Sequence, residues 1–343
     1  LDCNNYLRPG TYKFSESMKY LYFDEHEIES RCYKLFHRKF TSRYIGFIRK
    51  IVFFLFFDNH ININCGDKKF QGQVYLPGNV GNDSLSKKAK VFDFKSKQLI
   101  EIFDNKKEMD IKISYYIYFS RYFNTPKILE VNYSHNYLIE ELLTDEKTEL
   151  DTKRILLTIL KKQIMQIHNI HFITGVIDFK KLEHANEEIA HITEYDIIRN
   201  MKRDIKEYKL VSCIQHGDLW FENVIISNNK IILIDYEHTG EYLLYYDFFE
   251  YIFRECLLYK RYICLDSYIC GEYDYYLDQL LIKSKDKFYY ECKVDYFSIY
   301  VLYKKTILEM SKNELKKYIT IIEYIKEKRF ISNNFSIYNN IHI

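Results

Sequence analysis

Three oxygen-bearing side chains in one short stretch could together carry phosphoryl transfer. Asp218 and Asn223 lie in the run HGDLWFEN (216–223), and Asp235 follows a short apolar stretch. A carboxylate can align an acceptor hydroxyl and take its proton, and Mg²⁺ prefers a few hard oxygen ligands. We therefore expect Asp218 to be the catalytic base, and Asn223 and Asp235 to hold Mg²⁺. We expect His216 to orient the catalytic loop, because it lies two residues before Asp218.

Three short apolar runs are expected to bring these side chains together. Residues 211–214, 224–226 and 231–234 are predicted strands, and Asn228 and Asn229 form the turn between the last two. In this arrangement the loop with Asp218, the start of the next strand and the end of the hairpin can converge on one point.

The polar pattern resembles that of the kinase-like small-molecule phosphotransferases, which include aminoglycoside phosphotransferases, choline kinases and fructosamine kinases. The matching residues are His216-Gly-Asp218 with Asn223, the run IDYE (234–237), and Tyr246-Asp247. Several fixed spacings are met at once, which a lone His-x-Asp would not achieve.

This resemblance implies an α+β, bilobal, protein-kinase-like fold with a small antiparallel sheet in the N-lobe and a mainly helical C-lobe. It implies ATP and Mg²⁺ as cofactors, with ATP bound between the lobes. By the same resemblance Asp218 is the base, Asn223 and Asp235 are metal ligands that also serve nucleotide binding, and Asp247 braces the catalytic loop. An inactive relative could keep the same residues for shape alone.

Residues 61–143 are the expected nucleotide-binding lobe. The patterns predict a hairpin, a helix that stops before Pro126, and further short strands. The predicted strands are 73–76, 89–94, 98–103, 128–131 and 137–141, and the predicted helix is 106–122.

The nucleotide lobe departs from the superfamily pattern at its lysine. The third strand usually offers a Lys, but QLIEIF (98–103) contains none. Lys90 on the preceding strand could reach the phosphates, with Glu108 on the following helix as its partner. The alternative is an ordinary exposed strand lysine. The Gly-rich segment 77–84 could place backbone amides over the phosphates or be a plain turn.

The rest of the chain divides into an N-terminal extension and a C-lobe. Residues 144–343 are expected to form the helical C-lobe with the catalytic loop and the acceptor site, including helices over 151–168, over 195–208 and after Phe248. Residues 1–60 are predicted to be a mainly helical extension that mixes basic and aromatic residues. Such a segment could make peripheral contact with an anionic membrane, or pack on its own domain with a solvated basic face.

Composition excludes several classes of function. The formal net charge is +2, which gives no reason to expect a nucleic-acid partner. The eight cysteines have no metal-ligand spacing, so reduced thiols and a cytoplasmic setting are expected. The apolar run 51–57 is far shorter than the roughly 20 residues that span a bilayer.

The sequence leaves the acceptor open. We favour a small molecule or saccharide hydroxyl in bacterial glycan metabolism, with choline, ethanolamine or an aminoglycoside as the alternative acceptor. A cationic acceptor would use acidic and aromatic side chains, for which the candidates are Glu237, Glu241, Glu250, Glu255, Tyr242, Tyr245 and Tyr251. The alternative from another class is a catalytically silent kinase-like binding or scaffold protein.

Overall fold

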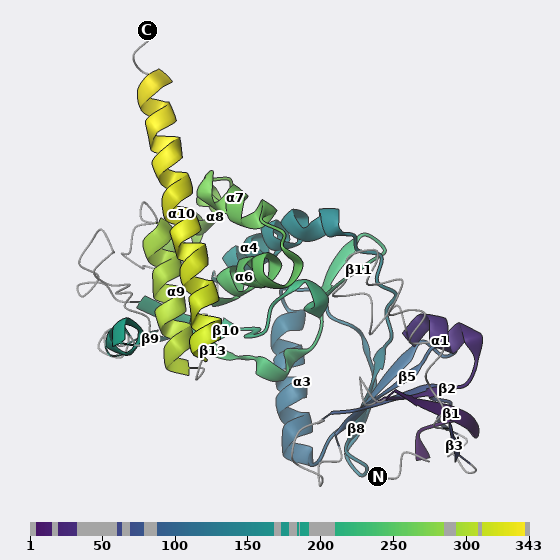
Figure 1. Cartoon of the computed structure of the whole chain (residues 1–343). Coiled ribbons are helices and arrows are strands. Elements are labelled where there is room, and N and C mark those ends of the chain that lie inside the picture. Colours follow the sequence, from purple (N-terminus) through teal and green to yellow (C-terminus); the bar gives the residue numbers. More distant parts are fainter. Residues whose placement is uncertain are drawn as a thin grey trace. The chain divides into compact units, whose positions relative to one another are not determined.

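The chain divides into two compact units, which are described separately. The computed structural model describes residues 5–15, 20–32, 60–63, 69–78, 88–167, 173–177, 184, 186–191, 210–284, 293–307 and 311–339. The first unit contains Leu1–Ser120, Asn124–Glu146 and Ile225–Leu233, and the second contains Arg121–Phe123, Lys147–Val224 and Ile234–Ile343 (Figure 1).

The first unit is built on an eight-stranded sheet with the order β3-β1-β2-β4-β5-β6-β8-β7, in which all neighbours are antiparallel. Its strands are β1 (Gly10–Ser15), β2 (Tyr20–Phe23), β3 (His60–Ile63), β4 (Val74–Pro77), β5 (Ala89–Asp93), β6 (Gln98–Ile102), β7 (Ile128–Asn132) and β8 (Tyr137–Glu141). The strands predicted from β4 to β8 are therefore confirmed.

The expectation of a mainly helical segment over residues 1–60 is wrong for the residues that the structure describes there. Strands β1 and β2 pair with each other and join the sheet, and only α1 (His26–Cys32) is helical. The physical reason is an alternation of period two: Tyr20 and Tyr22 are buried, whereas their neighbours in β2 are half-buried. Residues 33–59, which hold most of the basic and aromatic mixture, lie outside the described residues.

The two faces of this sheet carry different contacts. Val91, Ile100 and Ile139 are successive cross-strand partners on β5, β6 and β8, and they belong to one buried cluster. Leu138, which points to the opposite face, packs with Met109 of helix α3 (Lys106–Ser120). The predicted helix is thus confirmed, and it covers one face of the sheet.

The second unit is mainly helical. Its helices are α4 (Thr152–Ile167), α6 (Tyr246–Tyr259), α7 (Ile263–Ile269), α8 (Asp274–Ser284), α9 (Lys293–Ile307) and α10 (Lys312–Asn339). Helices α9 and α10 lie side by side (Figure 1). The helix predicted over 195–208 lies outside the described residues.

Short strands interrupt these helices near the predicted chemistry. Strand β10 (Leu210–Gln215) pairs with β9 (Ile173–Ile177) and β13 (Gly240–Leu243). Strands β11 (Val224–Ser227) and β12 (Lys230–Leu233) form the predicted hairpin, most of which belongs to the first unit. The α+β class, with an antiparallel sheet in the N-terminal part and helices in the C-terminal part, is confirmed.

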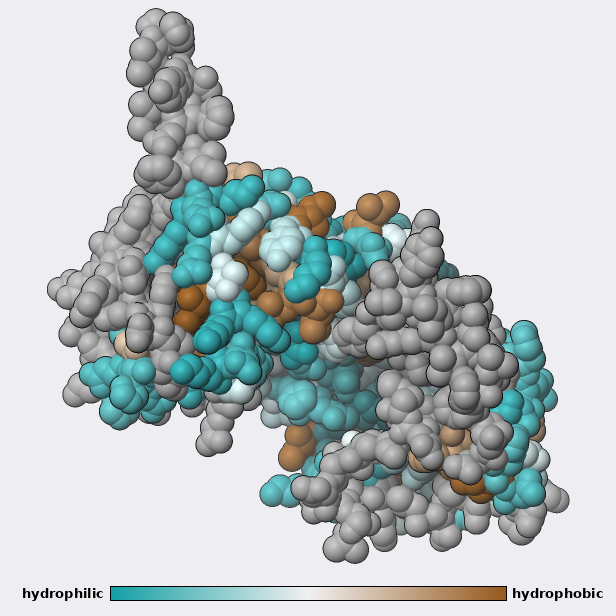
Figure 2. All heavy atoms as spheres, viewed as in Figure 1, coloured by the Kyte–Doolittle hydropathy of each residue, from teal (hydrophilic) through white to brown (hydrophobic). Residues whose placement is uncertain are grey.

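Exposed hydrophobic side chains are scattered in the described part of the chain. Figure 2 shows brown residues in separate patches among hydrophilic ones on the face that it draws. Leu150, Ile263 and Tyr275 are examples of such exposed residues. Scattered apolar side chains are ordinary on protein surfaces. None of the helices within the described ranges has the length and apolar character needed to cross a membrane.

The buried row across β5, β6 and β8 makes a stability prediction. Ile100 is 1% exposed, so Ile100→Ala removes packed methyl groups and should lower the free energy of unfolding by about 2–5 kcal/mol. Ile111, in α3 of the same unit, is 44% exposed, so Ile111→Ala should change it by less than about 0.5 kcal/mol. Urea unfolding of both variants checks this, and equal losses would contradict the assigned core.

Candidate active site

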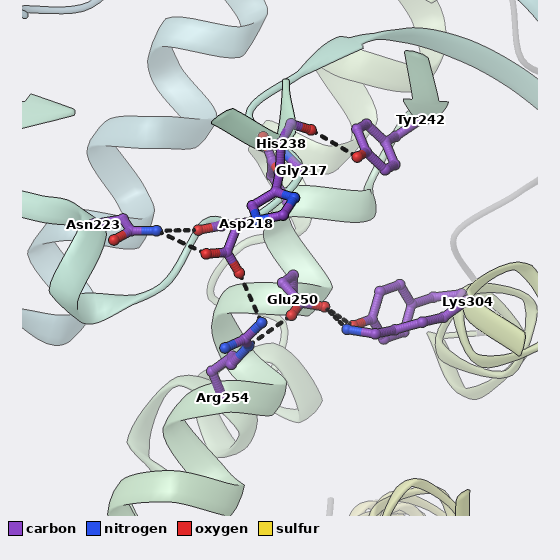
Figure 3. Close-up of polar contacts among 10 residues, drawn as sticks. Gly217, Asp218, Asn223, His238, Tyr242, Glu250, Arg254 and Lys304 are labelled. Atoms are coloured by element: carbon purple, nitrogen blue, oxygen red, sulfur yellow. Dashed lines mark hydrogen bonds and ion pairs between the residues drawn. The ribbon is translucent and has the colours of Figure 1, made fainter. Parts of the chain in front are cut away.

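The loop after β10 changes direction at Gly217, which only glycine fits. Gly217 has φ +80°, and a Cβ at this position would lie 2.1 Å from the His238 carbonyl oxygen and 2.6 Å from the Tyr242 hydroxyl. That hydroxyl donates to the same His238 carbonyl over 2.7 Å, as Figure 3 shows. A residue with a side chain would therefore have a strained backbone here and would clash with these atoms. Glycine avoids both problems and lets the loop turn into Asp218.

The buried carboxylate of Asp247 holds this loop. Its oxygens accept hydrogen bonds from the backbone N–H groups of His216 at 2.8 Å and Gly217 at 2.9 Å. The backbone N–H of Asp247 donates in turn to the Gln215 side chain at 3.0 Å. Burial raises the pKa of Asp247 to about 7, although both backbone hydrogen bonds oppose that rise. The expected bracing role of Asp247 is confirmed.

The His216 ring is a fixed part of the loop. It is fully buried, and Nε2 lies 2.8 Å from the carbonyl oxygen of Ile234, which can only accept, so Nε2 carries the proton. Burial lowers the pKa of His216, which favours the neutral ring. The side chain thus joins the loop that carries Asp218 to the residue before Asp235. This geometry suits an orienting role and gives the ring no path to a substrate hydroxyl.

Asp218 and Asn223 are brought together. Asn223 Nδ2 donates to the Asp218 carbonyl oxygen at 2.8 Å and to Asp218 Oδ2 at 3.0 Å. Since the amide nitrogen faces Asp218, the amide oxygen of Asn223 faces away and keeps its lone pairs for another partner. Asp218 is partly exposed, with 22% of its side chain accessible. A carboxylate so held can meet a hydroxyl from solution.

Asp235 lies next to this pair in the backbone. The N–H of Ile234 donates to the Asn223 carbonyl oxygen at 3.0 Å, which places the residue before Asp235 against Asn223. Asp235 itself has φ 66° and ψ 65°, a left-handed conformation that costs about 1–3 kcal/mol and that often occurs at functional sites.

The donor chemistry of these two residues fits Mg²⁺. One carboxylate and one amide oxygen are hard ligands, and Mg²⁺ usually takes few ligands from the protein. Within the described ranges, no group of three or more His, Cys, Asp and Glu side chains could hold a metal ion. The assignment of Asn223 and Asp235 as metal ligands therefore stays a proposal.

A chain of charges behind Asp218 was not predicted from the sequence. Arg254 Nη2 lies 2.7 Å from Asp218 Oδ1, and Arg254 Nε lies 2.7 Å from Glu250 Oε1. The other oxygen of Glu250 accepts hydrogen bonds from Lys304 and, at 2.5 Å, from the Tyr300 hydroxyl. Figure 3 shows the succession from Asp218 to Lys304. The four-residue spacing of Glu250 and Arg254 on a predicted helix was the available signal.

Charge compensation keeps the buried Glu250 ionised. Burial by itself would raise the pKa of Glu250, but the positive charges of Lys304 and Arg254 outweigh it and lower that pKa. Lys304 is only 4% exposed, so both members of its ion pair are withdrawn from water. Such a pair fixes geometry, because neither charge can be left alone in the interior at low cost.

This arrangement corrects the expected site for a cationic acceptor. Four of the seven candidate side chains are buried in the core: Tyr245, Glu250, Tyr251 and Glu255. Glu250 is paired as described above, and Glu255 accepts hydrogen bonds from Arg261 at 2.8 Å and Thr152 at 2.8 Å. Glu237, Glu241 and Tyr242 are exposed or half-buried. Glu250 and Glu255 of α6 therefore cannot contact an acceptor.

The expected partner of Lys90 is also corrected. In the first unit, Lys90 and Glu101 are cross-strand neighbours on β5 and β6, and their charged atoms lie 3.7 Å apart. Glu108 instead pairs with Lys88 at 3.0 Å. The buried Glu101 also pairs with Lys112 of α3 at 2.7 Å. Residues directly opposite on antiparallel strands share a face, and this register brings Lys90 to Glu101.

Comparisons with known proteins give remote structural matches. No protein-family model matches the sequence, and no curated protein matches it significantly. A choline kinase from Cryptosporidium parvum Iowa II is 16% identical, with a TM-score of 0.41 over 76% of this chain and 89% of that chain. A thermostable mutant of an aminoglycoside phosphotransferase is 11% identical, with a TM-score of 0.39 over 71% and 93%.

A third solved structure is a similarly remote match. A putative fructosamine-3-kinase from Haemophilus somnus is 16% identical, with a TM-score of 0.34 over 72% of this chain and 89% of that chain. At such identities and TM-scores, the matches transfer neither an activity nor a substrate to this chain.

The backbone at Gly217 generates the first prediction for this site. Gly217→Ala should lower the free energy of unfolding by at least about 1–3 kcal/mol. Alanine would have to adopt the positive φ of this position, and its methyl group would clash with the His238 carbonyl oxygen. Gly240→Ala is the matched control, since a Cβ there meets nothing closer than 3.3 Å. Thermal and urea unfolding measure both variants. An unaffected Gly217→Ala protein would contradict the described loop.

Titration of Asp247 generates the second prediction. Its pKa rises from 3.8 in the unfolded chain to about 7 in the fold, so the folded protein binds more protons between these values. The contribution of Asp247 to stability is therefore fully present below about pH 4 and is lost as the pH rises towards 7. The difference in unfolding free energy between the wild type and Asp247→Asn, measured by urea titration across this range, should fall with pH. A difference that rises with pH would contradict the burial of this carboxyl group.

Proposed function

We propose that the chain is an ATP- and Mg²⁺-dependent phosphotransferase that transfers the γ-phosphate to a hydroxyl of a small molecule or saccharide. The observation that supports this most is the presentation of Asp218, which combines partial exposure with fixation by Asn223 and Arg254. The loop behind it is braced by Asp247. A carboxylate that merely capped a turn would not need this support.

In the proposed reaction Asp218 accepts the proton of the acceptor hydroxyl. The acceptor oxygen forms a bond to the γ-phosphorus of ATP, and the bond from that phosphorus to the bridging oxygen breaks, which releases ADP. When bound, Mg²⁺ would neutralise phosphate charge. Asn223 and Asp235 would hold it through their side-chain oxygens, while His216 keeps the two backbone segments together.

The order of preference among the proposed acceptors is the one derived from the sequence. A saccharide hydroxyl in glycan metabolism remains the proposed acceptor, and choline, ethanolamine or an aminoglycoside remains the alternative. The burial of Glu250 and Glu255 in ion pairs weighs against the cationic alternatives. Peripheral membrane contact through residues 1–60 stays a prediction. For nucleotide binding in the first unit, Lys90 is proposed with Glu101 as its neighbour, and Glu108 no longer as its partner.

Two substitutions separate catalysis from metal binding. Asp218→Asn removes the base but keeps the shape, so ATP turnover should fall by about 100- to 10,000-fold while stabilisation by Mg²⁺ and ATP persists. Asp235→Asn removes a charged ligand, so both the turnover and that stabilisation should fall. ADP release and thermal unfolding with and without Mg²⁺ and ATP are the measurements.

The control is Asp110→Asn, an exposed carboxylate on α3, which should leave both readouts unchanged. If Mg²⁺ and ATP do not shift the unfolding temperature of the wild type, the enzyme proposal fails and the catalytically silent alternative gains. If Asp218→Asn turns over ATP at the wild-type rate, Asp218 is not the base.

A further inference from the structure

We propose that the acceptor carries an anionic group near the hydroxyl that is phosphorylated, as sugar acids and sugar phosphates do, and that Arg254 binds this group. This inference rests on the proposed function and specifies its substrate class. It depends on three features of the second unit: the unused donors of Arg254, the way its guanidinium is held, and the fate of the neighbouring acidic side chains.

The guanidinium of Arg254 has donors to spare at the place where an acceptor must arrive. An arginine offers five N–H donors in a planar fork. Nε serves Glu250 and one donor of Nη2 serves Asp218, each at 2.7 Å. The remaining three donors have no hydrogen-bond acceptor within the ranges that the structure describes, and 30% of the side chain is accessible. An acceptor whose hydroxyl reaches Asp218 therefore also reaches Arg254.

The fork is held in place before any ligand binds. Glu250 is 0% exposed and is itself fixed by Lys304 and Tyr300, so it acts as a rigid support for Arg254. The guanidinium also stands 5.1 Å from the ring centre of Trp220, a cation–π contact. A side chain that is already ordered loses less entropy on binding. Arginine forks match the oxygens of carboxylate and phosphate in two parallel hydrogen bonds.

The charges around Asp218 disfavour a cationic acceptor. An ammonium group brought to Asp218 would lie close to the positive charge of Arg254. Glu250, the carboxylate that holds Arg254, is paired with Arg254 and Lys304 and has no surface for a ligand. An anion meets the opposite situation, because it can use the free donors of Arg254 while the acceptor hydroxyl contacts Asp218.

A set of sugars that share one ring tests the charge preference. Glucuronate and glucose 1-phosphate are anionic, glucose is neutral and glucosamine is cationic, so charge is the main variable. The full chain is assayed with Mg²⁺ and ATP by ADP release, and kcat/KM is compared. We expect at least one anionic sugar to exceed glucose by roughly 10- to 100-fold, the factor that a charged hydrogen bond supplies. Glucosamine should be the poorest acceptor.

Substitution of the arginine tests the residue. Arg254→Gln also disturbs Asp218, so a general loss of turnover is expected and decides nothing by itself. The informative quantity is the ratio of kcat/KM for the anionic sugar to kcat/KM for the neutral sugar. This ratio should fall to about one in Arg254→Gln and to an intermediate value in Arg254→Lys. Calorimetric binding of the preferred anionic sugar in the presence of ADP should weaken in the same order, which gives a readout that does not need turnover.

The chain contains a matched control. Arg261 pairs with the buried Glu255 at 2.8 Å, as Arg254 pairs with Glu250, but among the described residues it does not contact Asp218. Arg261→Gln should therefore keep the preference for the anionic sugar. Thermal unfolding of both Gln variants shows whether either has lost its fold, in which case the Lys variants replace them in the comparison.

Each result has a defined meaning. A preference for glucose or glucosamine would overturn this inference and leave the proposed function standing. So would an unchanged anionic-to-neutral ratio in Arg254→Gln, or no phosphorylation of either anionic sugar by a protein that Mg²⁺ and ATP stabilise. If Mg²⁺ and ATP do not stabilise the wild type, the proposed function itself fails.

Discussion

The carboxylate of Asp247 accepts hydrogen bonds from two successive backbone amides and so ties helix α6 to the loop that carries Asp218. The helix then determines what else reaches that loop. Asp247, Glu250 and Arg254 follow one another at three- and four-residue intervals, so they share one face of α6. One helical face thus supplies the brace for the loop, the buried carboxylate and the guanidinium that contacts Asp218.

Charges alternate along this face and its neighbours. The order is Lys304, Glu250, Arg254 and Asp218, each opposite in sign to the next. A buried charge without a partner is energetically costly. Removal of one member of the row would therefore leave its neighbour without an opposite charge. The same penalty that makes the row costly makes its geometry specific: Arg254 has one position in which both of its carboxylate partners are satisfied. Helix α9 therefore influences the side chain of Asp218 through two intervening residues.

Sequence patterns predicted the parts of this structure that depend on local spacing. The strands around the loop of Asp218, the hairpin before Asp235 and helical structure after Phe248 follow from short-range periodicity and turn residues, and all are present. The loop brace was predicted by resemblance. Strands β1 and β2 were missed because their tyrosines alternate over only a few residues beside a basic, aromatic segment. The pairing of Glu101 rather than Glu108 with Lys90 depended on strand register, which a single sequence does not give.

The charged residues that surround an active site mislead when they are counted rather than placed. Acidic and aromatic side chains are abundant from residue 237 to residue 255, which favours a cation-binding pocket on composition alone. Burial reverses this interpretation, because a carboxylate with no exposed surface attracts no ligand and instead holds a cationic side chain of the protein. The buried carboxylate of Glu250 in this way fixes the positively charged Arg254 beside Asp218. In the proposed function, the sign of the charge that an acceptor meets beside Asp218 is then set by Arg254, which is partly accessible and keeps free donors.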